Sequence, residues 1–368
     1  MSLRTETTIA LPDVEAVLSL LCEHMLEHDA RVTRETGETT IALGTGLARM
    51  RAGPSGLSIA IEAPDLASLQ ELKRAIASHV VEFAPAGVVA GITWAGDGSA
   101  PSLLPDFRLV TVTGVQQLTP HMRRISFRGD DLARYNSLEA LHVRLFLPPE
   151  GLTEPAWPML GADGMLKQPE PERRPSVRKY TVREIDPTAG TLAIDFVLHD
   201  DAGPGSAFAA RAAIGDRIGL AGPGGRGLRS ASRYVFLCDE TGLPALSRML
   251  ENLPGDAQGC AIIEVASGAE EQPLNAPPGV EVSWLRRDEA SSGETSPLRT
   301  AFDALAWPED GPDAYLWAAT EYEDFRHIRA AARQRLRAGR DHHLIVSYWR
   351  KGLSEDQHAA EKRAARAE

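Results

Sequence analysis

The sequence predicts a multidomain protein: a small α+β domain, then an antiparallel six-stranded β-barrel, then a doubly wound α/β domain. Three observations lead to this prediction. A glycine- and proline-rich segment at residues 84–107 divides the chain. Six short alternating segments follow it, separated by turn residues, as is typical of a barrel. From about residue 232 onwards, strands and helices alternate. We expect the limits 1–96, 104–230 and 231–352, with a charged, helix-prone tail at 353–368.

In the first domain, two helices are expected to flank a run of strands. Residues 13–28 carry apolar side chains at helical spacing, with Asp13 as a suitable N-cap, and residues 66–83 repeat that spacing. Between them, residues 39–63 alternate in polarity and turn at a Gly-Pro-Ser-Gly sequence, which indicates two or three strands.

The barrel and the α/β domain are read from the same kind of pattern. The barrel strands are expected at 106–115, 122–129, 142–149, 178–185, 191–199 and 216–225, with one helix at 206–214. The α/β strands are expected at 234–240, 260–267, 280–287, 314–321 and 343–349, and the helices at 243–253, 298–305 and 324–338.

Composition narrows the function classes. The net charge of -12 argues against nucleic acid or an anionic membrane as a partner, because both need a basic surface. No apolar run approaches the roughly 18–20 residues of a membrane span, and the first residues lack the apolar region of a signal peptide, so we expect a cytoplasmic protein. Cys22, Cys238 and Cys260 form no CxxC pair and are expected to be small core residues.

Residues 177–184, VRKYTVRE, place a tyrosine and a threonine between two arginines on a strand. A flavin needs an aromatic face, a hydroxyl near its redox nitrogen and cations for its phosphates. Tyr180 is expected to stack on the ring, Thr181 to reach its edge, and Arg178 with Arg183 to neutralise phosphate. The alternative is a solvated strand with one half-buried tyrosine.

This region resembles the flavin domain of the siderophore-interacting protein family, a group of ferredoxin-reductase-like flavoproteins. In that family an Arg-x-Tyr-Thr strand holds FAD, and a glycine-containing loop at a helix start cradles the pyrophosphate. The loop corresponds here to residues 199–206, with Gly205 in place of the usual alanine and Phe208 where tryptophan is common. A helix N-terminus offers backbone N–H groups to phosphate, so we expect flavin binding to be retained.

The resemblance extends to residue 352. Residues 237–254 look like the family's entry to the nicotinamide half, Glu321 matches its Ala-Gly-Glu segment, and residues 346–352 match its Tyr-Trp-Arg-x-Gly signature. Arg326 and Arg329 are placed where cations could read a 2′-phosphate, which would favour NADPH over NADH, although arginines on an outer helix face are usually just solvated. The cofactor-binding residues implied are Arg178, Tyr180, Thr181, Val182, Arg183, Val197, His199, Gly203, Pro204, Gly205, Ser206, Thr241, Glu321, Arg326, Arg329 and Trp349, with Tyr180 and Thr181 also expected to be catalytic.

The resemblance implies an FAD-dependent NAD(P)H oxidoreductase that reduces a ferric siderophore. Basic residues would hold the anionic chelate: Arg144, Arg226, and one of His343, Arg350 and Lys351. Two alternatives remain open. One is a flavin reductase with a protein partner such as ferredoxin, and the other is a siderophore or iron carrier without turnover.

The first domain resembles a small domain of unknown function that is found fused to this family. His24 and His28 share a helix face, and His79 lies near the end of the second helix, so three imidazoles could converge on a metal. Histidines at helix ends more often cap carbonyls or form hydrogen bonds, so no metal is expected, and the three-histidine site is kept as the alternative.

Overall fold

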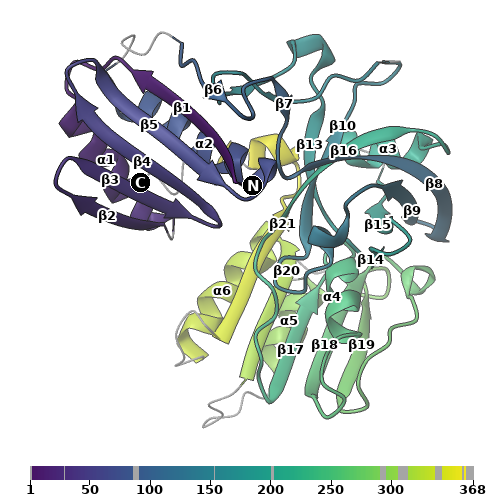
Figure 1. The fold of residues 1–368 in the computed structure, drawn as a ribbon. Helices are drawn as coiled ribbons and strands as arrows, with labels where there is room; N and C mark the ends of the chain where they lie inside the picture. Colours follow the sequence, from purple (N-terminus) through teal and green to yellow (C-terminus); the bar gives the residue numbers. More distant parts are fainter. Residues whose placement is uncertain are drawn as a thin grey trace. The chain divides into compact units, whose positions relative to one another are not determined.

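The computed structural model describes residues 2–28, 30–85, 91–152, 154–199, 203–290, 296–305, 314–335, 342–358 and 360–361 (Figure 1). The chain forms two compact units. Unit 1 comprises Met1–Phe107 and Pro148–Pro175, and unit 2 comprises Arg108–Leu147 and Ser176–Glu368. Among the described helices, none combines the length and the apolar character needed to cross a bilayer.

Unit 1 is an antiparallel sheet with two helices packed on one face, which confirms the α+β expectation. The sheet order is β2-β3-β4-β5-β1-β6. Both helices begin at an aspartate: the side chains of Asp13 and Asp65 accept from the backbone N–H of Ala16 and Ser68. Strand β1, which no pattern predicted, pairs with β5 along its whole length. The elements are β1 (Leu3–Ile9), α1 (Val14–Glu27), β2 (Arg31–Glu35), β3 (Glu38–Leu43), β4 (Gly46–Gly53), β5 (Gly56–Ala63), α2 (Leu66–Phe83) and β6 (Ala95–Gly96).

Residues 148–175 pack within unit 1, although they lie between two barrel strands in the sequence. They contribute β11 (Met159–Leu160) and β12 (Leu166–Lys167), which form a small sheet with β7 (Ser102–Leu103). The Trp94 indole donates to the carbonyl of Asp163 at 3.1 Å, and the fully buried Lys73 donates to the carbonyl of Gly98 at 2.9 Å. Trp94 is buried in the unit 1 core, so part of the expected linker is structural.

The barrel of unit 2 is a single sheet in the order β13-β10-β16-β8-β9-β15-β14. Its elements are β8 (Phe107–Thr119), β9 (Met122–Gly129), β10 (His142–Leu147), β13 (Ser176–Thr181), β14 (Glu184–Asp186), β15 (Thr191–Val197), α3 (Pro204–Arg211) and β16 (Arg217–Gly224). The expected strand at 178–185 is divided at Val182 and Arg183, which gives seven strands instead of six. Because β13 and β14 are the two edges of the sheet and follow each other in the chain, this short connection joins the edges.

The α/β part of unit 2 is a parallel sheet of five strands, as predicted, and their order is β19-β18-β17-β20-β21. The strands are β17 (Arg233–Cys238), β18 (Gln258–Val265), β19 (Val280–Arg286), β20 (Ala314–Glu321) and β21 (His343–Trp349), and the helices are α4 (Leu243–Leu250), α5 (Pro297–Ala304) and α6 (Tyr322–Arg335). Successive residues of β17 point to opposite faces: Phe236 packs in the core with α4, and Val235 in the core with α5 and α6. The sheet is therefore covered on both faces, and its carboxyl edge is where ligands bind in such folds.

Candidate functional site

Strand β13 brings the predicted arginine, tyrosine and threonine to the edge of the barrel. It pairs with β10 in antiparallel register, with Tyr180 opposite Val143. Arg178 and Thr181 are buried, Tyr180 is half-buried, and Lys179 is exposed. The strand is therefore not a simple solvated edge, because the arginine and the threonine are withdrawn from water.

Tyr180 fits against the first turn of α3. Its ring lies 4.4 Å from that of Phe196, centroid to centroid, and burial raises the pKa of its hydroxyl. A Cβ added at Gly205 would lie 2.1 Å from the Tyr180 hydroxyl oxygen. The unusual glycine at 205 is therefore what lets the tyrosine occupy this position.

The start of α3 has the geometry of an anion cradle. Gly203 is the N-cap and Pro204 the first helical residue, and the Ser206 hydroxyl accepts from the backbone N–H of His199 at 3.1 Å. The first N–H groups of a helix have no partner within the helix and carry its positive end. Val197 ends β15, and the exposed His199 follows it. These residues fit the pyrophosphate of a dinucleotide.

Arg178 is held by the C-terminal tail. Its guanidinium donates to both carboxylate oxygens of Asp356, at 3.1 and 2.9 Å, and lies 3.4 Å from Glu355. The tail is fixed by His358, which is buried with its Nε2 3.0 Å from the Ser347 hydroxyl. Carboxylates of the tail therefore bind Arg178 where a phosphate group was expected. The Arg178 guanidinium is thus already paired with negatively charged groups.

Val182 and Arg183 connect the barrel to the α/β half. Arg183 donates to both oxygens of Glu251, at 3.0 and 2.6 Å, and the carbonyl of the buried Val182 accepts from Arg248 at 2.8 Å. Arg183 was predicted to neutralise phosphate, and here it neutralises the carboxylate at the end of α4.

At the carboxyl edge of the parallel sheet, the buried Asp239 binds both a residue of the turn that follows it and a residue far away in sequence. It accepts from the backbone N–H of Thr241 at 2.8 Å and from the Trp349 indole at 2.8 Å. Burial raises the pKa of Asp239 to about 6, although these hydrogen bonds act to lower it. The sequence prediction missed Asp239; the available signal was an aspartate directly after a buried strand.

Two further contacts complete this edge. Glu321 accepts from the backbone N–H of Lys351 at 3.0 Å, which joins the end of β20 to the end of β21. His142 of the barrel lies with its Nε2 2.6 Å from the Tyr348 hydroxyl, and burial, with the charge of Lys179, lowers the pKa of His142 to about 4.

The predicted chelate-binding residues fall into separate places. Arg144 is exposed on β10 directly opposite Lys179 on β13, a second cation that the sequence prediction missed. Arg350 follows β21 with its guanidinium 4.5 Å from a tyrosine ring centroid, and Lys351 is exposed beside it. His343 begins β21, so it lies at the opposite end of that strand. The remaining candidate, Arg226, is exposed in the loop after β16.

The helix α6 presents a basic, aromatic surface with a hollow of about 570 Å³. Arg326 lies 6.0 Å from the Tyr322 ring centroid, and Arg329 lies 5.5 Å from that of Phe325. Arg326 is 62% exposed and 3.6 Å from Glu323, so its charge remains available to a ligand.

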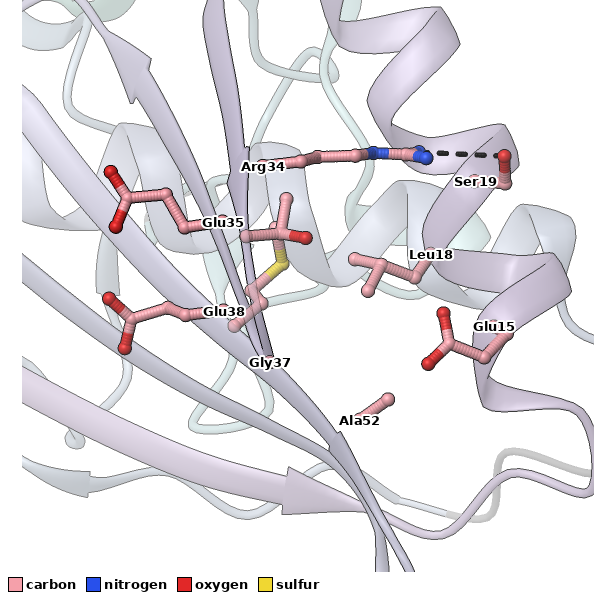
Figure 2. Close-up of a pocket in the computed structure, with 10 residues that line it drawn as sticks. Glu15, Leu18, Ser19, Arg34, Glu35, Gly37, Glu38 and Ala52 are labelled. Atoms are coloured by element: carbon pink, nitrogen blue, oxygen red, sulfur yellow. Dashed lines mark hydrogen bonds between the residues drawn. The ribbon is translucent and has the colours of Figure 1, made fainter.

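Unit 1 contains a smaller pocket of about 180 Å³ between α1 and the strands β2 to β4 (Figure 2). Glu15, Glu35 and Glu38 line it, and Arg34 donates to the Ser19 hydroxyl at 3.4 Å. Its acidic lining makes it unsuited to a phosphate or a siderophore, and it contains none of the predicted cofactor-binding residues.

Comparison with known proteins agrees with this geometry. The model of the siderophore-interacting FAD-binding domain matches residues 111–227, and that of the siderophore-interacting protein matches 231–352. A model described as an uncharacterized protein conserved in bacteria matches residues 6–95.

Individual relatives cover about half to three quarters of the chain. The ferric vibriobactin reductase of Vibrio cholerae is 27% identical over 258 residues, 69% of this chain and 93% of its own length. The NADPH-dependent ferric-chelate reductase of Escherichia coli is 35% identical over 190 residues, 50% of this chain and 72% of its own. The solved siderophore-interacting protein of Aeromonas hydrophila has a TM-score of 0.61 at 33% identity, covering 72% of this chain and 99% of its own.

Proposed function

The chain belongs to the siderophore-interacting protein family, and from this premise we propose that it is a reductase that uses FAD to pass electrons from NAD(P)H to Fe(III) in a siderophore. The observation that carries the proposal is the meeting of β13 with the first turn of α3. There a tyrosine ring, a buried threonine and the N-terminal N–H groups of α3 lie within one edge of the barrel.

The residues present suit each part of the cofactor. The first turn of α3, with Ser206, would hold the pyrophosphate, while Tyr180 and Thr181 would orient the ring. Arg178 would add a positive charge for the phosphates once its ion pair with Asp356 has opened. When bound, FAD accepts a hydride from a nicotinamide and can release the two electrons one at a time, so one NAD(P)H reduces two Fe(III) to two Fe(II) and leaves NAD(P)⁺ and a proton.

Reduction releases the metal because siderophore oxygen donors are hard anions that suit Fe(III) better than Fe(II). The chain's task is to hold a bulky anion beside the flavin. Arg144 and Lys179 offer paired cations on neighbouring strands. Lys351 offers another cation at the end of β21, beside Arg350, which forms an ion pair with Glu361. No protein ligand to iron is needed for this role.

The nicotinamide is proposed to bind at the carboxyl edge of the parallel sheet, near Thr241, Glu321 and Trp349. Arg326 and Arg329 on α6 would contact a 2′-phosphate, which favours NADPH. The NADPH dependence in the name of the Escherichia coli relative supports this choice. We assign residues 104–230 to FAD and 231–352 to the nicotinamide, and we place the reaction in the cytoplasm, where NADPH is supplied.

The test is anaerobic oxidation of NADPH and NADH by the purified protein with a ferric siderophore and an Fe(II)-specific chromophoric chelator. We expect a yellow protein that forms two Fe(II) for each NADPH consumed. Arg326→Ala should raise KM for NADPH several-fold and leave KM for NADH unchanged, while the exposed Arg217→Ala serves as the control.

The other hypotheses predict different results. A colourless protein that binds the chelate without turnover would indicate a carrier. Electron transfer that occurs only after a ferredoxin is added would indicate a reductase with a protein partner.

A further inference from the structure

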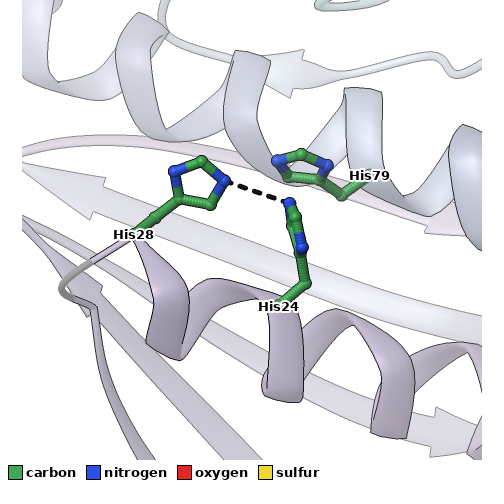
Figure 3. Close-up of side chains that lie close together, drawn as sticks. All are labelled: His24, His28 and His79. Atoms are coloured by element: carbon green, nitrogen blue, oxygen red, sulfur yellow. Dashed lines mark hydrogen bonds between the residues drawn. The ribbon is translucent and has the colours of Figure 1, made fainter. Parts of the chain in front are cut away.

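We propose that His24, His28 and His79 bind a divalent first-row transition-metal ion in unit 1. The three rings come from neighbouring helices: His24 from α1, His28 from its C-cap and His79 from α2. Figure 3 shows the three rings facing a common space between the two helices. The site contains residues of unit 1 only, and its existence does not depend on the proposed reductase activity.

The distances suit one ion. Each histidine offers a ring nitrogen, and these three atoms all lie within 4.8 Å of one another. The Nε2 atoms of His24 and His28 are 3.0 Å apart. Two imidazole nitrogens at about 2.0–2.1 Å from a tetrahedral ion are separated by roughly 3.3 Å, so side-chain movements of a few tenths of an ångström to about 1.5 Å would complete the site.

Carboxylates orient two of the rings. Glu82 contacts Nδ1 of His79 at 2.9 Å, and Glu27 lies 3.5 Å from Nδ1 of His24. A carboxylate on Nδ1 fixes the tautomer and leaves Nε2 to bind the metal, which is the arrangement around many metal-bound histidines. The ring of Phe83 lies 5.5 Å from that of His24 and 6.0 Å from that of His79, so it forms an apolar wall beside both.

The ligand chemistry selects the class of ion. Imidazole nitrogen suits Zn²⁺, Fe²⁺, Co²⁺, Ni²⁺ and Cu²⁺, whereas Ca²⁺ and Mg²⁺ require oxygen ligands. His28 is exposed and the other two rings are partly exposed, so a fourth coordination position would face water. Three protein ligands with an open position are typical of sites that exchange or activate a ligand, not of closed structural sites.

A hydrogen bond between His24 and His28 accounts for only two members of the cluster. It does not explain why His79 approaches with its own carboxylate already in place, 4.4 Å from His24 between ring centroids. A metal would replace that hydrogen bond and bring all three imidazoles into one coordination sphere.

The experiment is titration of untagged, chelator-stripped full-length protein with Zn²⁺ by calorimetry, and with Co²⁺ by visible absorption. We expect one tight site and the intense d–d bands of low-coordinate cobalt, with Ca²⁺ giving neither. His79→Ala should weaken Zn²⁺ binding at least a hundredfold, and His327→Ala, at a partly exposed histidine of unit 2, should leave it unchanged.

A second pair of variants tests the orienting carboxylate. Glu82→Gln should weaken Zn²⁺ binding about 10- to 100-fold, while Glu71→Gln, an exposed glutamate of the same helix, should have no effect. Circular dichroism and flavin content identify any variant that fails to fold. The proposal is overturned if the folded His79→Ala protein binds Zn²⁺ as tightly as the parent does, or if the parent shows no stoichiometric site.

Discussion

The charged side chains at the two ends of the proposed flavin–nicotinamide site have different kinds of partner. At the barrel end, Arg178 and Arg183 form ion pairs with carboxylates of the tail and of α4. At the sheet edge, the donors described around the buried Asp239 are neutral groups. Asp356 is 76% exposed at its side chain and can return to water, so its place can be taken by an anionic ligand. Asp239 is buried and cannot move into water, so it becomes neutral only by binding a proton. At the barrel end an exposed carboxylate can therefore give way to another anion, whereas at the sheet edge the charge of Asp239 depends on pH.

The strongest test of the barrel end is Tyr180→Ala. Loss of the ring removes the face proposed to support the flavin and empties the notch beside Gly205, so we expect FAD binding to weaken at least a hundredfold and the protein to purify without colour. Tyr180→Phe should keep most of the flavin. Flavin content and fluorescence titration measure both, and full occupancy in the alanine variant would contradict the placement.

The sheet edge predicts two opposite pH effects, each about 3 kcal/mol at most. The pKa of Asp239 is raised from 3.8 to about 6, so its stability contribution is present below pH 4 and is lost as pH rises through 6. The pKa of His142 is lowered from 6.5 to about 4, so its contribution is present above pH 6.5 and is lost as pH falls towards 4. In the parent the two effects oppose each other.

Single variants should reveal each effect. Between pH 7.5 and 5, Asp239→Asn should lose more stability than the parent on acidification, and His142→Asn should lose less. Urea unfolding at the two pH values measures this, with the double variant as the control for additivity. Parallel pH profiles for all four proteins would show that neither group titrates as stated.

Arg183→Ala compares a buried ion pair with an exposed one. The Arg183 side chain is 12% exposed and Glu251 is 29% exposed, so removing the guanidinium should destabilise unit 2 by about 1.5–3 kcal/mol. The Arg326 side chain is 62% exposed beside Glu323, so Arg326→Ala should lower the free energy of unfolding by less than about 0.5 kcal/mol. Equal losses of thermal stability in Arg183→Ala and Arg326→Ala would show that the buried ion pair is worth no more than the exposed one.

Removing the carboxylates of the tail should have a smaller effect than removing the Arg183 guanidinium. Replacing Glu355 with Gln and Asp356 with Asn together should free Arg178 and tighten FAD binding about three- to tenfold, because flavin no longer competes with two carboxylates. The control is Asp186→Asn, at an exposed aspartate that ends the far edge strand β14. Fluorescence titration with FAD measures both proteins. Weaker FAD binding in the double variant would mean that the tail supports the site.

Much of the fold was predictable because the apolar residues of most helices and strands recur at the spacing typical of that element. The N-cap of α1, the alternation along β10 and the apolar strands of the α/β half are local signals, and the structure confirms that fold class. The packing of residues 148–175 within unit 1 was not predicted, since two-residue strands have no period and the packing around them depends on Lys73 and Trp94 in another part of the chain.

Some residues of the proposed site could be predicted from the local sequence, and others could not. A strand pattern can place Tyr180 and Thr181 side by side, but no pattern shows that Arg178 meets Asp356, 178 residues away. Asp239 and the indole at the end of β21 are 110 residues apart and meet only because β17 and β21 flank β20 in one parallel sheet. Such pairs depend on topology and register, which the local sequence does not contain.

The links between the barrel and the parallel sheet have a mechanical consequence. Val182, Arg183 and His142 bind α4 and β21, and the buried Glu270 of the α/β half accepts from the Thr119 hydroxyl of the barrel. Opening these halves like a hinge would expose several charged groups at once. These contacts therefore oppose a hinge opening between the barrel and the parallel sheet.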